Sequence, residues 1–465
     1  MSAGELKVIN PYTGEPCIVL PMLDAADVDS IVTRAREAFA QWRWTSIAER
    51  KALCERFMTA FAAMREETAR KITMQMGKPL RQAQNEVNTM LDRARHMIDI
   101  AEETLRDEYL PEKDSFTRYI RHEPKGVVLD IAAWNYPLLI AVNVVVPAVL
   151  AGNAVIIKHS SKTPLCGRAF TEAFAKAGMP DGLVQDIIAD HAVTEAFIRH
   201  PGVNHVSFTG SVRGGREVSR AAAGRFIDVG LELGGKDPAY VCADAPFEFA
   251  VENCVDGAFY NAGQSCCAIE RIYVEEPLYD RFVEAAAALI RRYKMGDPMA
   301  DDVTLGPMAS KDAPAFLAGQ VQDAVACGGR LVVDPREFAL PKQGWFAAPA
   351  LVAGCPQDCA LVQDESFGPV IAVLPVSGDE EAVRLMNDSA YGLTASIWTM
   401  DVARAVRIGE RIETGTFYLN RCDFLDPALP WTGVKDTGKG VTLSRYGLLN
   451  LTQLKSMHLR TALPT

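Results

Sequence analysis

The sequence lacks the features that mark nucleic-acid-binding, metal-binding and exported proteins. Acidic residues outnumber basic ones by 59 to 48, and the net charge of −11 argues against a broad nucleic-acid footprint. The 11 cysteines are irregularly spaced, with no Cys-x-x-Cys pair near histidines, which excludes a typical zinc site or a small disulfide framework. Positions 1–20 lack the basic flank and apolar run of a signal peptide. We therefore expect reduced thiols, a cytoplasmic location, no bound metal and a small-molecule partner.

One long stretch without charge needs a separate explanation. Residues 131–157 carry no charged side chain and are numerous enough to cross a bilayer. Turn residues and helix breakers divide the stretch into a helix of about ten residues and a short strand at 154–157. These dividing residues are Asn135, Asn143, Pro147 and the pair Gly152-Asn153. We predict two buried elements of an α/β core and no membrane insertion.

The pattern along the chain predicts an α/β protein with two domains. A chain of 465 residues exceeds the size of a single hydrophobic core. Residues 24–105 have apolar positions at helical spacing, which predicts a helical opening segment. Short β-branched runs then alternate with helices, as in βαβ units with a parallel sheet, at 126–131, 154–157, 182–188, 205–208 and 228–231.

A second series of the same kind follows. It contains predicted helices at 247–262 and 279–293, and predicted strands at 271–274, 370–373 and 394–398. Two further strands, at 116–122 and 451–459, are expected at exposed edges. Edge strands of this kind are available to pair across subunits.

Two adjacent cysteines are candidates for a nucleophile. Cys266 ends the turn Gly263-Gln264-Ser265-Cys266, where small neighbours leave a thiol open to a substrate. A free cysteine is more often a small buried hydrophobic residue, and Cys267 has the same surroundings. The composition of the turn therefore does not choose between the two.

Three further positions have both a structural and a functional interpretation. Glu232, between two leucines at the end of an apolar strand, is either structurally paired or partly buried with a raised pKa suited to a general base. Asn135 follows a strand and is either an oxyanion donor or a turn residue. Ser211 opens a helix and is either a simple N-cap or part of a phosphate site.

Taken together and in this order, these motifs resemble the aldehyde dehydrogenase superfamily. The matching pieces cover most of the chain and are Trp134-Asn135-Tyr136-Pro137, Lys158, Phe208-Thr209-Gly210-Ser211, Glu232-Leu233-Gly234-Gly235-Lys236, Gly263-Gln264-Ser265-Cys266, Glu365-Ser366-Phe367-Gly368-Pro369, Asn387 and Trp431-Thr432-Gly433-Val434-Lys435. The resemblance selects Cys266 over Cys267 as the nucleophile.

The resemblance also implies a mechanism. The Cys266 thiolate attacks an aldehyde, and the side-chain amide of Asn135 with a backbone N–H at Cys266 holds the oxyanion. Hydride passes to the nicotinamide and leaves a thioester, which water activated by Glu232 hydrolyses to a carboxylic acid. Acylating relatives that use coenzyme A typically lack this glutamate, so hydrolysis is favoured. An acylating enzyme and a catalytically silent nucleotide-binding protein remain the alternatives.

The family fold implied by the resemblance has three parts. They are a Rossmann-like NAD(P)-binding domain at 1–109 and 126–235, a catalytic α/β domain at 236–440, and a β-strand oligomerisation arm at 110–125 and 441–465 that would build a homodimer or homotetramer. The implied cofactor contacts are Trp134, Lys158, Ser161, Gly210, Ser211, Arg213, Leu233, Glu365 and Phe367.

Two departures from the family pattern bear on specificity. NAD-using relatives commonly have a glutamate at the position of Ser161, and Arg213 replaces what is often an acidic residue, so NADP is favoured while NAD remains open. Similar succinic semialdehyde dehydrogenases often carry an arginine six residues before the nucleophile, where this chain has Tyr260. This tyrosine argues against a dicarboxylic semialdehyde. A largely apolar tunnel is expected from Tyr136, Leu139, Tyr260, Ser265, Cys267 and Phe424.

Overall fold

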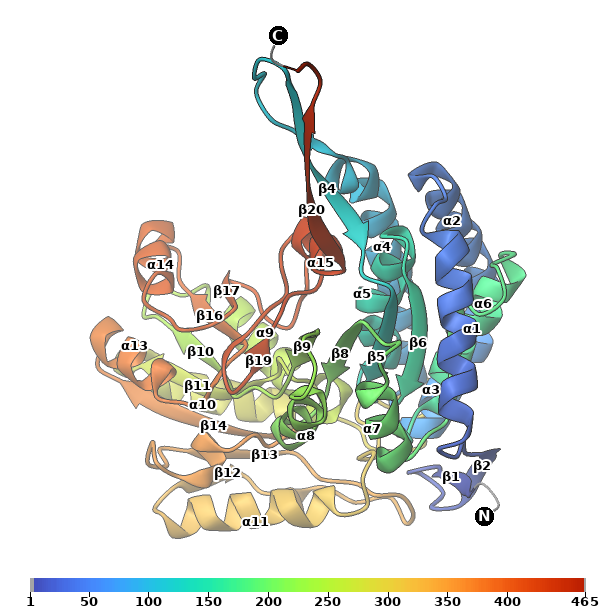
Figure 1. Ribbon diagram of the computed structural model, residues 1–465. Helices are drawn as coiled ribbons and strands as arrows, with labels where there is room; N and C mark the ends of the chain where they lie inside the picture. Colours follow the sequence, from blue (N-terminus) through green and yellow to red (C-terminus); the bar gives the residue numbers. More distant parts are fainter. Residues whose placement is uncertain (1–3, 464–465) are drawn as a thin grey trace.

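The computed structural model describes residues 4–463 and contains two α/β units and a long antiparallel arm that projects away from them (Figure 1). One unit is built on a six-stranded sheet and the other on a seven-stranded sheet. This arrangement confirms the predicted α/β class with parallel sheets. A hairpin of β1 (Glu5–Ile9) and β2 (Pro16–Pro21), which the sequence did not predict, lies beside the first unit near the N-terminus.

Four helices form the predicted opening segment. They are α1 (Asp27–Trp42), α2 (Ile47–Ala63), α3 (Arg65–Met76) and α4 (Leu80–Leu105). Helix α2 begins with a capping box in which the Ser46 side chain accepts a hydrogen bond from the Glu49 backbone N–H and the Glu49 carboxylate accepts one in return. Gly77 ends α3 in the left-handed conformation, with φ of 82°.

The first sheet follows the predicted βαβ pattern. Its strand order is β19-β9-β8-β5-β6-β7, and all strands except β19 run parallel. The parallel strands are β5 (Val127–Ala132), β6 (Ala154–His159), β7 (Val184–Asp186), β8 (His205–Thr209) and β9 (Asp228–Glu232), and the helices between them are α5 (Pro137–Leu150), α6 (Pro164–Lys176), α7 (His191–Arg199) and α8 (Val212–Ala222).

The long uncharged stretch forms the end of β5, the whole of α5 and the first four residues of β6 in this unit. Every residue of β5 and β6 is buried, and α5 is buried on nearly all sides. Its uniform hydrophobicity therefore reflects burial within the protein. Among the described residues, no helix has both the length and the apolar character needed to cross a membrane.

The second sheet has the order β12-β13-β14-β11-β10-β16-β17. All its strands are parallel except β12. The strands are β10 (Asp237–Val241), β11 (Ile269–Glu275), β12 (Arg330–Val333), β13 (Ala350–Ala353), β14 (Val370–Val376), β16 (Thr394–Trp398) and β17 (Thr416–Leu419). The sequence predicted β11, β14 and β16 but not the other four.

The remaining elements connect these strands. They are α9 (Phe247–Phe259), η1 (Tyr260–Gly263), α10 (Glu276–Ile290), α11 (Ala313–Ala326), η2 (Pro335–Glu337), α12 (Ala360–Gln363), α13 (Asp379–Asn387), β15 (Tyr391–Gly392), α14 (Val402–Gly409), β18 (Val434–Lys435), β19 (Gly438–Lys439) and α15 (Ser444–Asn450). Helix α10 starts and ends three residues earlier than predicted, because Pro277 suits the first turn of a helix.

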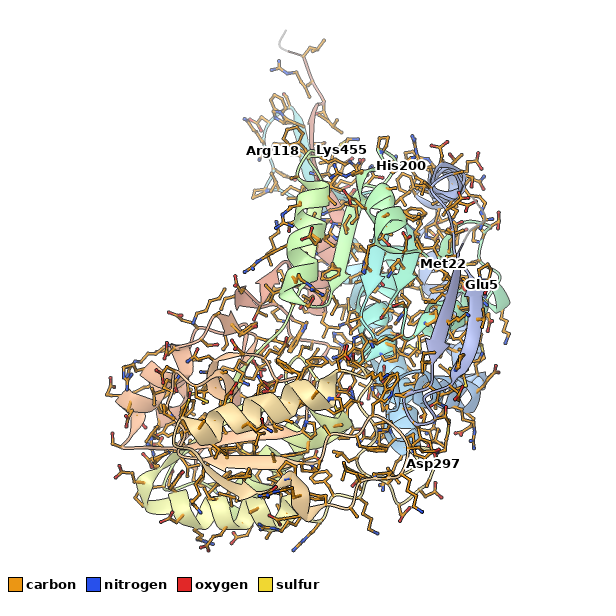
Figure 2. The ribbon with its side chains drawn as sticks, turned by 90° about the horizontal axis from the view of Figure 1, so that it is seen from below. Glu5, Met22, Arg118, His200, Asp297 and Lys455 are labelled. Carbon is orange, nitrogen blue, oxygen red and sulfur yellow. The ribbon has the colours of Figure 1, made fainter. Side chains whose placement is uncertain are left out.

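The two predicted edge strands pair with each other in the same chain. Strand β4 (Phe116–Pro124) runs antiparallel to β20 (Thr452–Arg460) along its whole length, and β3 (Glu108–Tyr109) adds a third strand. In Figure 2, Arg118 and Lys455 mark the two long strands where they extend beyond the body of the molecule. One edge of each strand is thus already occupied, and any contact with a second subunit would use the remaining edge or faces of this arm.

Candidate active site

The three predicted catalytic side chains line one cavity of about 290 Å³. Asn135 comes from the loop after β5, Glu232 from the end of β9 and Cys266 from the turn after α9. The six residues expected to form a tunnel also line this cavity; they are Tyr136, Leu139, Tyr260, Ser265, Cys267 and Phe424. Residues distant in sequence thus share one site between the two sheets.

The turn that carries Cys266, the predicted nucleophile, has an unusual backbone. Helix α9 ends at Phe259, three residues before the predicted end, because Asn261 and Ala262 adopt left-handed φ values of 53° and 56°. Gly263 follows with φ of 69°, and a Cβ there would lie 2.3 Å from the carbonyl oxygen of Gly368. Left-handed backbone is costly for residues other than glycine and is found where surrounding contacts enforce it.

Hydrogen bonds supply those contacts. The Asn261 side-chain amide donates to the carbonyl oxygens of Asn135 and Gln264, each at 3.1 Å. The Gln264 side chain in turn accepts a hydrogen bond of 2.9 Å from the backbone N–H of Ala309. Hydrogen bonds therefore hold the turn at both ends. The Asn261 side chain links the turn that carries Cys266 directly to the loop of Asn135.

The structure distinguishes the two adjacent cysteines. Cys266 is partly exposed and lines the cavity. Cys267 is buried, and its Sγ donates a hydrogen bond of 3.0 Å to Oδ1 of Asp423. A hydrogen bond with Cys266, burial and the nearby Asp423 carboxyl raise the pKa of the Cys267 thiol well above its usual value. Because the thiolate is the nucleophilic form, Cys267 is a poor nucleophile near neutral pH.

Glu232 has the environment of a general base. Burial raises the pKa of its carboxyl to about 8, while a hydrogen bond from the Thr442 hydroxyl acts in the opposite direction. That bond to Oε1 is 3.3 Å long. A carboxyl with a pKa near the operating pH can both take up and release a proton.

The two glycines after Glu232 permit close approach. A Cβ at Gly235 would lie 2.3 Å from the carbonyl oxygen of Cys266, and one at Gly234 would lie 2.6 Å from the Glu365 carboxylate. Only glycine lets the backbone pass so near both groups. The lack of side chains at Gly234 and Gly235 lets the strand that ends at Glu232 lie against the turn that carries Cys266.

Asn135 is held by its backbone and presents its amide to the cavity. The residue is buried, and its carbonyl accepts the bond from Asn261 described above. Within residues 4–463, no recorded hydrogen bond involves its side-chain amide. The following residues are anchored by His159, whose Nε2 lies 3.0 Å from the Pro137 carbonyl oxygen, and burial lowers the pKa of this imidazole to about 4. His159 is therefore neutral and donates to Pro137.

The predicted cofactor residues fall into an inner and an outer group. In the inner group, the rings of Trp134 and Phe367 pack edge to face with centroids 5.5 Å apart, and the Glu365 carboxylate accepts a bond of 3.1 Å from the Gly235 N–H. Burial raises the pKa of Glu365 to about 7. The buried Glu270 orients this loop by accepting from the backbone N–H groups of Ser366 and Phe367, at 2.7 and 2.8 Å.

The remaining cofactor residues lie on the first sheet and its loops. Lys158, at the end of β6, is 8% exposed, and within the described chain its amine makes no hydrogen bond. A buried ammonium without an acceptor suits a ligand that brings hydroxyl or phosphate oxygens. The Ser211 hydroxyl accepts from Gly214 at 3.2 Å, so it does serve as an N-cap of α8. Ser161 and Arg213 are exposed, while the backbone N–H groups of Gly210 and Leu233 bond to Glu232 and Thr437.

Among the cavity residues that were not predicted from the sequence, three bear on its chemistry. Arg93 enters from α4, Asp423 from the loop after β17, and Thr442 from the segment before α15. Arg93 had a detectable signal, because it falls in phase with the buried face of its helix. Asp423 and Thr442 lie in irregular segments and had none. No group of side chains in residues 4–463 has the composition and spacing to hold a metal ion.

Comparison with known proteins agrees with this geometry. The model of the aldehyde dehydrogenase family matches residues 1–457. The chain belongs to this family. A succinate-semialdehyde dehydrogenase (NADP+) from Mycobacterium tuberculosis is 33% identical over 454 residues, covering 97% of this chain and 99% of the relative. A protein of the same description from Deinococcus radiodurans is 34% identical over 447 residues, covering 96% and 93%.

Solved structures of aldehyde dehydrogenases have the same fold. An NAD-dependent aldehyde dehydrogenase from Sinorhizobium meliloti superposes with a TM-score of 0.95 at 31% identity, covering all of this chain and 94% of the other. Betaine aldehyde dehydrogenase from Staphylococcus aureus, in complex with NAD+, gives 0.94 at 29% identity, covering 99% and 93%. This chain is thus an NAD(P)-dependent aldehyde dehydrogenase. Its relatives include enzymes named for each of the two cofactors.

Proposed function

We propose that this aldehyde dehydrogenase oxidises its substrate to a carboxylic acid through a thioester on Cys266 that water hydrolyses. The observation that carries the proposal is the convergence of Cys266, Asn135 and Glu232 on one cavity. The pKa of Glu232, raised to about 8, adds a base of suitable strength. Enzyme nucleophiles and bases are commonly recognised by such convergence of side chains with perturbed pKa values.

Each residue has a distinct part in the reaction. The Cys266 thiolate forms a C–S bond with the aldehyde carbon, and the oxyanion is held by the Asn135 amide and the backbone N–H of Cys266. Bound NAD(P)+ supplies the hydride acceptor that turns this adduct into a thioester. Glu232 then removes a proton from water, the resulting hydroxide adds to the thioester carbon, and the C–S bond breaks to release the acid and the thiolate.

We assign the cofactor to the residues described above. Trp134, Glu365 and Phe367 would hold the nicotinamide and its ribose, and Lys158 with the start of α8 at Gly210 and Ser211 would hold the adenosine and pyrophosphate end. Leu233 completes the contacts. Ser161, without a negative charge, and Arg213 favour the 2′-phosphate of NADP. The names of the mycobacterial and Deinococcus relatives point in the same direction.

We further propose a cytoplasmic homodimer or homotetramer with the three-part domain division expected from the sequence. The arm of β4 and β20 supports the oligomer, because it extends beyond the body and exposes apolar side chains such as Leu454. All 11 cysteines are unpaired, which fits a reducing compartment.

The direct experiment is a panel of aldehydes assayed with NAD+ and with NADP+ in the absence of coenzyme A. We expect aldehyde-dependent formation of reduced cofactor, with a higher kcat/KM for NADP+, and one carboxylic acid per cofactor reduced. A requirement for coenzyme A would refute the role given to Glu232. Cofactor binding without any reduction would identify a catalytically silent protein.

A further inference from the structure

A buried arginine without a carboxylate partner lines the substrate cavity. Arg93 of α4 is 5% exposed, and its Nη1 donates to the Leu139 carbonyl oxygen at 3.3 Å and to Oδ1 of Asn143 at 3.2 Å. Its Nε is buried and makes no hydrogen bond, and within residues 4–463 none is recorded from Nη2. Nε is shielded from the cavity and Nη1 already donates twice, so Nη2 is the donor of Arg93 that remains for a ligand at the cavity wall.

The carboxylates that share the cavity do not neutralise this charge. Of Glu86, Glu232, Asp256 and Asp423, none forms an ion pair with Arg93 in the described part of the chain. Glu86, about two turns earlier on α4, is already paired with the buried Lys78 and accepts a bond of 2.8 Å from the Leu138 N–H. Removing a cation from water without a partner is costly, so such a charge calls for an anionic ligand.

Arg93 lines the same cavity as Cys266. Burial lowers the pKa of the Arg93 guanidinium to about 10, and the thiols of Cys267 and Cys266 together with Glu86 oppose that change. Leu139 and Asn143, which Arg93 contacts, belong to the same wall.

We propose that Arg93 binds a carboxylate at the far end of the substrate, and that the preferred substrates are short aldehydes with a terminal carboxylate. The proposal rests on the proposed function of this same cavity. A guanidinium donates charge-assisted hydrogen bonds to carboxylates, and Nη2 of Arg93 has no acceptor among the described residues. The sequence argument from Tyr260 considered only one position, whereas α4 supplies a cation to the same cavity.

An amine-bearing substrate is the competing possibility, because Asp423 also lines the cavity. Its Oδ1 already accepts hydrogen bonds from the Ser265 hydroxyl at 3.2 Å and from Cys267 at 3.0 Å. Burial raises the pKa of this carboxyl to about 7, so it is only partly ionised near neutral pH. Arg93, by contrast, is fully charged and unpaired, and the observations favour a carboxylate.

The test compares three aldehydes with four-carbon chains: succinic semialdehyde, butanal and 4-aminobutanal. We expect the highest kcat/KM for succinic semialdehyde. In Arg93→Gln, the ratio of kcat/KM for succinic semialdehyde to that for butanal should fall by about 10- to 100-fold, the usual effect of losing a hydrogen bond to a charged group. Arg93→Lys keeps the charge and should recover part of the ratio. Arg95→Gln, an exposed position on the same helix, is the matched control and should not change it.

A binding measurement separates this proposal from the proposed function. Calorimetry with succinate should show binding to the wild-type enzyme and to Arg95→Gln, and at least tenfold weaker binding to Arg93→Gln, with thermal melting as the check on folding. Equal use of butanal and succinic semialdehyde, or unchanged succinate binding in Arg93→Gln, would overturn the role of Arg93. A preference for 4-aminobutanal would overturn it in favour of Asp423. Absence of aldehyde oxidation with succinate binding that depends on Arg93 would refute only the proposed function.

Discussion

Cys266 and Cys267 are adjacent in the sequence, but their thiols lie in different surroundings. The Cys266 thiol faces the cavity, whereas the Cys267 thiol is buried and bonded to Asp423. Burial and a neighbouring carboxyl both disfavour a thiolate at Cys267. Composition does not distinguish the two cysteines, and the family pattern selects Cys266 as the nucleophile. The different surroundings of the two thiols give this selection a physical reason.

We predict that Cys266→Ala and Cys267→Ala differ sharply in activity. Cys266→Ala removes the atom that bonds to the substrate and should lower kcat by about 10³-fold or more. Cys267→Ala should keep kcat within about threefold, since truncating a buried small side chain changes packing more than chemistry. Steady-state formation of NADPH measures both. Comparable losses in the two variants would contradict the assignment.

Glu232 should act after the cofactor has been reduced. Glu232→Gln is expected to lower steady-state kcat by about 10²- to 10⁴-fold, the range for loss of a general base, while a first burst of about one NADPH per site survives. In the wild type, the base form gains population as pH rises through about 8, so kcat should increase with pH up to that value. Stopped-flow absorbance and a pH profile test both points. Loss of the burst itself would place Glu232 earlier in the reaction.

The apolar periodicity of α4 indicates that two of its charged residues are buried. The buried face of α4 includes Met90 and Met97, and Glu86 and Arg93 fall at the same helical spacing. Charged residues in phase with an apolar face are either paired or functional. Periodicity places both side chains on the buried face. It does not show that Lys78 pairs with Glu86 and leaves Arg93 without a charged partner.

At the scale of elements, local pattern predicted long elements and failed for short ones. The helical character of residues 24–105 was predicted from its apolar spacing, without its division into four helices, and the five parallel strands of the first sheet were predicted from their β-branched runs. Strand β10 begins with Asp237-Pro238, a pair that favours turns, and is held in the sheet by neighbours on both sides. Strands β12 and β13 have four residues each, too few to show a period. The left-handed turn at Asn261 and Ala262 depends on contacts with distant loops.

The arm should control assembly. Leu454 and Leu459 of β20 are 62% and 42% exposed, and Tyr109 of β3 is 69% exposed. Burying such side chains in a subunit interface would release ordered water and stabilise the oligomer. The double variant Leu454→Asp, Leu459→Asp should therefore lower the mass measured by light scattering by at least half. Leu340→Asp, at an exposed position away from the arm, is the control. A monomeric wild-type enzyme would contradict the prediction.

At the scale of the whole molecule, the site makes stability depend on pH. Burial raises the pKa of Glu232 to about 8 and those of Glu365 and Asp423 to about 7, against roughly 4 in an unfolded chain. The folded state therefore holds protons that the unfolded state has released. This contribution to stability is complete below pH 4 and is lost as pH rises through 7 and 8.

We expect the apparent Tm to fall between pH 6 and pH 9, and to fall less in Glu232→Gln. Removing one such carboxyl should reduce the decrease by about 2 °C for a protein of this size. Glu284→Gln, at an exposed helical position, is the control and should follow the wild type. The buried His159 has a pKa lowered to about 4, against roughly 6.5 in an unfolded chain, so its opposing contribution is complete by about pH 7 and is the same in all three proteins. Identical slopes in all three proteins would show that Glu232 is ionised throughout.

Near its C-terminal end the chain comes back to the first sheet. This late contact determines when the surroundings of Glu232 are complete during synthesis. Strand β19 pairs with β9 beside Glu232, and Thr442 bonds to the Glu232 carboxylate. The ribosome synthesises β19 and Thr442 long after it has synthesised Glu232 and Cys266. The surroundings of Glu232 are therefore complete only after residues 438–442 have emerged from the ribosome and folded back onto the first sheet.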